Sequence, residues 1–164
     1  ELMVTEPCLK GCPARISHSA EYMFCVYQCK RIQEKMGKLV WFFKNVQIFP
    51  WNLEYYSAIG INNFKYLPGA VNQDRVSFTN VDNLEKYLHI VENGIEGYSA
   101  FNIFNDVFAL QLPAKMNIKL SSVLPLFPKM EHFVKHGHKC ASRCDVDCTY
   151  CIDCARAIEK ILLL

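Results

Sequence analysis

The sequence predicts an α/β fold, and three observations lead to this prediction. Short β-prone or apolar runs alternate with helical segments along the chain, which is the pattern of α/β proteins. The chain has 164 residues, of which 51% are hydrophobic, enough for one ordinary domain with its own core. No internal repeat or low-complexity segment interrupts the alternation.

The first two elements flank the first cysteines. Residues 2–5 (Leu-Met-Val-Thr) form a β-prone run that ends shortly before Cys8, so we expect the first cysteines to lie on a loop after a strand. The segment from residue 17 or 19 to residue 36 contains no Pro or Gly and precedes Gly37. It is therefore predicted to be a helix that stops at this glycine.

The next elements are predicted from apolar runs and turn residues. Residues 39–43 form a dense apolar and aromatic run, typical of a buried strand. Asn52 can cap a short helix through residue 58, and Gly60 can end it in the left-handed conformation. Residues 61–66 then fit a strand, which gives a helix followed directly by a strand.

The second half of the chain is predicted to be more helical. A helix capped by Asn80 or Asp82 runs to Gly94. Residues 98–123 give no clear pattern, whereas residues 129–135 and 154–164 each fit a helix. The helix that ends at Gly94 has apolar residues at helical spacing, namely Val81, Leu84, Leu88 and Val91.

Composition excludes several classes of protein. The net charge of +2 is too small for a nucleic-acid or anionic membrane surface. No apolar run approaches the roughly 20 residues that span a bilayer, and the start at Glu1 carries no secretory signal. The odd number of nine cysteines favours metal binding or redox chemistry in a reducing compartment, which we expect to be the cytoplasm.

The first cysteine group consists of two pairs. In each pair three residues separate the sulfurs, and twelve residues lie between the pairs. Four thiolates fit a tetrahedral zinc ion or a four-iron cluster, and the spacing does not choose between them. The alternative is that the second pair is a set of small buried residues on one helix face. The group comprises Cys8, Cys12, Cys25 and Cys29.

The second cysteine group is denser and lies near the C-terminal end. Such crowding of thiolates is relieved by a cation, so we expect zinc or a second iron–sulfur cluster here. The alternative is a set of reduced free thiols. His132, His136 and His138 precede the group, and the last two are alternative ligands. The cysteines are Cys140, Cys144, Cys148, Cys151 and Cys154.

Two separated stretches of the sequence carry a family resemblance. Residues 5–18 contain Glu6-x-Cys8-x-x-x-Cys12-Pro13-x-Arg15-x-x-His18. This run resembles the segment Asn-Glu-x-Cys-x-x-x-Cys-Pro-x-Arg-x-x-His of the peptidase U32 family, with Thr5 in place of the Asn. Residues 50–65, in which an aromatic helix leads through Gly60-Ile61 to Phe64-Lys65, are similar to a second family stretch.

The resemblance implies a partial (β/α) barrel over residues 1–127, followed by a Cys-rich metal-binding segment and helix over residues 128–164. It also implies a [4Fe–4S] cluster, with Cys12, Cys25 and Cys29 as ligands and Cys8 as a local fourth ligand. Arg15 and His18 follow the first cysteine loop, where a cation or a base could face a substrate, and are the candidate catalytic residues. The alternative for His18 is an ordinary surface residue. The implied activity is an oxygen-independent, hydroxylation-type modification of an RNA, an aromatic compound or a peptide, and a partner chain could complete the barrel.

Two other functions remain open from the sequence. The chain could be a non-enzymatic zinc or iron–sulfur module that binds a partner protein, with both cysteine groups structural. It could also be a fragment of a radical S-adenosylmethionine enzyme, since Cys144-x-x-x-Cys148-x-Tyr150-Cys151 fits the three-cysteine motif of those enzymes.

Overall fold

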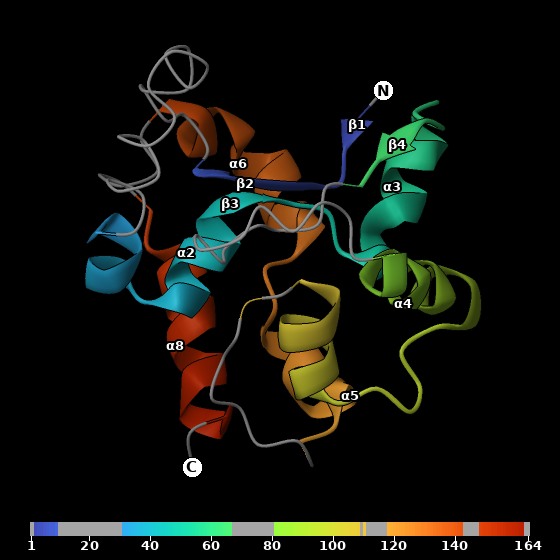
Figure 1. Cartoon of the computed structure of the whole chain (residues 1–164). Coiled ribbons are helices and arrows are strands. Elements are labelled where there is room, and N and C mark those ends of the chain that lie inside the picture. The colour runs from blue at the N-terminus through green and yellow to red at the C-terminus, as the bar shows by residue number, and fades with distance from the viewer. Residues whose placement is uncertain are drawn as a thin grey trace.

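The computed structural model describes residues 2–9, 31–66, 81–108, 110, 118–142 and 148–162. This part of the chain is mostly helical (Figure 1). The strands are β1 Leu2–Met3, β2 Thr5–Leu9, β3 Asn45–Gln47 and β4 Phe64–Lys65. The helices are α2 Lys38–Lys44, η2 Pro50–Asn52, α3 Leu53–Ala58, α4 Val81–Asn93, the π-helix η3 Asn102–Val107, α5 Leu120–Val123, η4 Leu124–Leu126, α6 Met130–Ser142 and α8 Tyr150–Leu162.

The predicted α/β architecture with a partial (β/α) barrel over residues 1–127 is wrong. In the described ranges, β1 pairs in parallel with β4, β2 pairs antiparallel with β3, and no larger sheet forms. A (β/α) barrel needs a continuous ring of parallel strands. The expectation of a partner chain that completes the barrel rested on this architecture.

The clearest local difference is at residues 39–43, which form helix α2 instead of a strand. A short apolar run fits either a buried strand or a buried helix. All five residues of this run are buried. One side of α2 packs on α8 (Figure 1), and Phe42 and Phe43 belong to the hydrophobic core. A helix covered on both sides needs no polar face.

Several predicted boundaries are confirmed. The helix predicted from residue 17 or 19 ends at Gly37 as expected: residues 31–36 are helical, and the φ of Gly37, 90°, is left-handed. Residues 17–30 of that prediction lie outside the described residues. Gly60 follows α3 with a φ of 87°, and Gly94 follows α4 with a φ of 82°. The two helices predicted near the C-terminus are also present as α6 and α8. The predicted strand over residues 61–66 shortens to β4, and Cys8 lies within β2, not on a loop after a strand.

A cluster of aromatic rings forms the centre of the core. The ring centroid of Phe49 lies 5.0 Å from that of Phe127, 5.1 Å from Trp51 and 5.8 Å from Phe108. Phe127 also stacks on Phe104 of η3 at 5.4 Å. Offset-stacked and edge-to-face rings at these distances add about 0.5–1.5 kcal/mol per pair beyond the burial of their area.

Two tyrosine hydroxyls connect the core to distant backbone. Tyr87 of α4 donates a hydrogen bond to the carbonyl oxygen of Ile48 at 2.7 Å. Tyr66 donates to the carbonyl oxygen of Val107 at 2.7 Å. Burial raises the pKa of both hydroxyls, so they stay protonated donors, and each satisfies a carbonyl that would otherwise lose its hydration without compensation.

The helices in the described ranges are too short or too polar to cross a membrane.

The ring cluster yields the first prediction. Phe49→Ala should lower the free energy of unfolding by about 3–5 kcal/mol, because a large buried ring is replaced by a cavity. Ile59→Ala is the control, since Ile59 is 72% exposed, and it should change stability by no more than about 0.5 kcal/mol. Urea unfolding with matched m-values measures both, and equal effects of the two substitutions would contradict this description of the core.

Candidate functional site

The start of α6 and the segment before α8 bring a thiol and an imidazole together. His132 Nε2 lies 3.8 Å from the Sγ of Cys148, although 16 residues separate them. Both residues are half-buried. Thiol and imidazole groups in contact can form a sulfur hydrogen bond, and both can bind a transition metal. We refer to His132 and Cys148 as the Cys–His pair.

Tyr150 fixes the position of the His132 ring. The two rings stack with centroids 3.7 Å apart and planes inclined by 12°. The Tyr150 hydroxyl accepts a hydrogen bond from the backbone N–H of Lys129 at 2.9 Å. A single side chain at the start of α8 therefore holds both the imidazole and the backbone that leads into α6.

The beginning of α8 is fixed by its own polar contacts. The Thr149 hydroxyl donates to Asp153 Oδ2 at 2.7 Å, and the Asp153 N–H donates to the Thr149 carbonyl at 2.9 Å. These bonds tie the residue after Cys148 to the first turn of the helix. A carboxylate in the first turn also complements the positive end of the helix dipole.

The environment of His132 favours its neutral form. Burial lowers the pKa of His132, and the neighbouring His136, with a ring centroid 4.9 Å away, lowers it further. The backbone of α6 bends at His136, whose φ of −122° and ψ of 20° are not helical. A neutral imidazole keeps a lone pair that can accept a hydrogen bond or bind a metal ion.

The other described cysteines of the second group lie in different surroundings. Cys151 is 8% exposed and belongs to the hydrophobic core. Cys154 is half-buried, and burial raises the pKa of its thiol while the hydrogen bond with Tyr150 acts in the opposite direction. The part of the chain that the structure describes holds no group of three or more His, Cys, Asp or Glu side chains arranged to bind one metal ion.

Most residues predicted for the first cysteine group, and two cysteines of the second, have no described side chain. The backbone of Cys8 is in β2, and that of Cys140 is in α6, but the structure describes neither side chain. The predicted roles of these two cysteines remain predictions, as do those of the residues outside the described ranges: Cys12, Arg15, His18, Cys25, Cys29 and Cys144.

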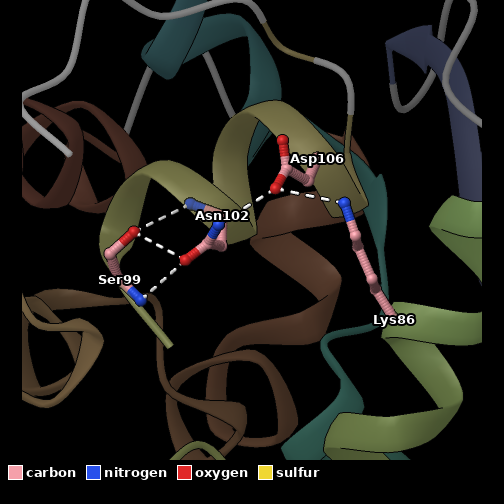
Figure 2. Close-up of polar contacts among 4 residues, drawn as sticks. All are labelled: Lys86, Ser99, Asn102 and Asp106. Carbon is pink, nitrogen blue, oxygen red and sulfur yellow. Dashed lines mark hydrogen bonds and ion pairs between the residues drawn. The ribbon is translucent and has the colours of Figure 1, made fainter. Parts of the chain in front are cut away.

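A second polar cluster joins α4 to the π-helix η3 (Figure 2). Asn102 accepts hydrogen bonds on Oδ1 from the N–H and the hydroxyl of Ser99, and its own N–H donates to Ser99 Oγ. Asn102 Nδ2 donates to Asp106 Oδ2 at 2.9 Å, which also lies 3.2 Å from Lys86 Nζ. The reciprocal bonds of Ser99 and Asn102 have the pattern of a capping box and close the turn that leads into η3. The contacts of Asp106 with Asn102 and Lys86 hold η3 to α4.

Comparison of the chain with protein-family models, curated proteins and solved structures finds no match. The relation to the U32 family therefore stays a resemblance carried by two short stretches of sequence.

The pairing of His132 with Cys148 was missed from the sequence. The sequence drew attention to the cysteines and to the later histidines, and it did not single out His132. One available signal was the four-residue spacing of His132 and His136, which places both on one face if the helix predicted over residues 129–135 extends by one residue. The role of Tyr150 as the ring that supports His132 had no signal in the spacing.

The contact between His132 and His136 predicts how a substitution changes the pKa of His132. His136→Ala should raise the pKa of His132 in the metal-free protein, because it removes a neighbouring imidazole that opposes protonation. The contribution of His132 to folding stability is fully present above its ordinary pKa of 6.5 and is lost as the pH falls below it. NMR titration of the His132 ring measures the shift.

His89→Ala is the control for this titration, because His89 lies on α4 and bonds Tyr98. It should leave the His132 pKa unchanged. An unchanged or lower pKa of His132 in His136→Ala would contradict the described arrangement.

Proposed function

We propose that the chain is a zinc-binding module in which His132 and Cys148 bind one zinc ion and fix the contact between α6 and α8. The 3.8 Å separation of Nε2 and Sγ carries the proposal. Zinc bonds of about 2.3 Å to sulfur and about 2.0–2.1 Å to nitrogen, at tetrahedral angles, place two such donors about 3.6 Å apart. The observed pair needs only a small adjustment to reach this separation.

The chemistry of the donors favours zinc over an iron–sulfur cluster at this place. Structural zinc sites combine imidazole and thiolate, whereas most iron–sulfur clusters are held by thiolates alone. The lowered pKa of His132 favours the neutral imidazole, in which one ring nitrogen has the free lone pair that metal binding requires. Tyr150 stacks on the ring and supports its orientation.

Further ligands are needed for four-coordinate zinc. His136 offers a second imidazole beside His132. Cys140 and Cys144 remain the sequence-based predictions for the other positions. Cys151 is less suited to this role, because its side chain packs among the buried residues of α8, including Ala155 and Ile158.

A structural zinc ion would stabilise the fold rather than take part in a reaction. Binding free energy for a site of this kind is also folding free energy, and a 164-residue chain with short paired strands gains a fixed helix contact from it. The oxygen-independent hydroxylation predicted from the family resemblance would need the first cysteine group with Arg15 and His18, and no described residue bears on it. The radical-enzyme alternative depends on Cys144, Cys148 and Cys151, of which Cys148 contacts His132 and Cys151 is in the core.

Metal content of purified variants tests the proposal. The wild-type chain should contain zinc. His132→Ala and Cys148→Ala should each lower zinc affinity by at least about tenfold, the loss typical even of residues that only orient a ligand. His89→Ala should keep full zinc content. Elemental analysis measures the zinc content, and a competitive chelator titration measures the zinc affinity.

Two outcomes would overturn the assignment. Iron and acid-labile sulfide that His132→Ala and Cys148→Ala each deplete would replace the zinc site by an iron–sulfur cluster. Full zinc content in both His132→Ala and Cys148→Ala would show that the metal lies elsewhere. Cys151→Ala separates the two cysteine roles, because it should lower stability and leave zinc affinity unchanged.

A further inference from the structure

Helix α4 has an apolar face that its own core does not cover. Its buried residues are Asn83, Tyr87 and Ile90, which face the rest of the molecule, where α4 contacts η2 and η3. A second set of apolar residues points away from this contact. It consists of Val81 at 58% exposure, Leu88 at 45%, Val91 at 40% and the half-buried Leu84. We call these four residues the α4 stripe.

The spacing of the α4 stripe is that of a helix that packs against another helix. The four positions follow one another at intervals of three, four and three residues, the spacing of the a and d positions of a coiled coil. At about 100° per residue they form one row that borders the buried face on the side of Tyr87. A contiguous apolar row of this kind, unlike a single exposed apolar residue, is a surface that a second helix can cover.

Acidic residues border the other side of the α4 stripe. Glu85 follows Val81 by four positions, and Glu92 follows Leu88 by four. Both are exposed, and within the described residues neither forms an ion pair or a hydrogen bond. The lysine of this helix, Lys86, lies on the far side of the buried face from the α4 stripe and pairs with Asp106 (Figure 2). The negative charge beside the stripe is therefore available to an incoming cation.

We propose that the α4 stripe docks an amphipathic helix of a partner protein whose apolar row is bordered by Lys or Arg. Its apolar residues would cover Val81, Leu88 and Val91, and its basic residues would face Glu85 and Glu92. Glu85 and Glu92 fall at the e positions of this spacing. A second copy of α4 would therefore set glutamates against glutamates if it packed antiparallel, and would offer them no basic residue if it packed parallel. An anionic membrane surface would be repelled by the same two glutamates. Neither His132 nor Cys148 lies on α4, so this inference goes beyond the proposed zinc site.

Two synthetic helices serve as probes. Each has about 21 residues, because shorter isolated helices are marginal in water, with Leu at the a and d positions. One has Lys at the flanking positions and the other has Glu. Fluorescence anisotropy with the full chain should show binding of the Lys helix about tenfold tighter than that of the Glu helix, as expected from two or more exposed charge pairs.

Variants of the chain identify the surface. Leu88→Asp should abolish binding, and the double variant Glu85→Lys with Glu92→Lys should reverse the preference toward the Glu helix. Val134→Asp is the matched control, because Val134 is 77% exposed on α6, and it should bind like the wild type. Circular dichroism confirms that the variants remain folded.

Other outcomes would overturn the proposal. These are no binding of either helix, binding that Leu88→Asp leaves intact, and equal affinity for both helices in low salt. Self-association that Leu88→Asp abolishes would assign the stripe to a second copy. Binding to vesicles of anionic lipid through the stripe would assign it to a membrane.

Discussion

The structure depends on the burial of Phe49 and Phe127 against each other. Phe49 lies between α2 and η2, and Phe127 follows η4, so their contact at 5.0 Å joins two distant parts of the chain. Phe127 is three residues before α6, and α8 packs on both α2 and η4. The ring contact therefore sets where α6 begins relative to α8, and with it the distance between His132 and Cys148.

The sequence allowed the helices with clear ends to be predicted. Gly37, Gly60 and Gly94 end helices in the left-handed region, where glycine has little steric cost. The run over residues 39–43 was misjudged because five consecutive apolar residues have no periodicity that separates a helix from a strand. Coverage of α2 on both sides decided the question, and this is a tertiary property.

The barrel prediction was wrong because strand pairing, too, is a tertiary property. The barrel was implied by two short stretches of sequence. In the structure, the pairs β1–β4 and β2–β3 involve only a few residues of each strand. At the candidate site, the density of cysteines predicted metal binding, but it did not indicate which thiols lie close together in the fold. The core stripe Cys151, Ala155, Ile158 and Leu162 has helical spacing, so burial of Cys151 could have been predicted. The partner of Cys148 depends on how α6 meets α8, which no local pattern specifies.

Zinc K-edge X-ray absorption of the zinc-loaded chain identifies the ligand atoms themselves. We expect both sulfur and imidazole nitrogen around the metal, with loss of an imidazole contribution in His132→Ala and of a sulfur contribution in Cys148→Ala. A spectrum with sulfur ligands alone, or one that neither substitution changes, would contradict the assignment of the Cys–His pair as a metal site.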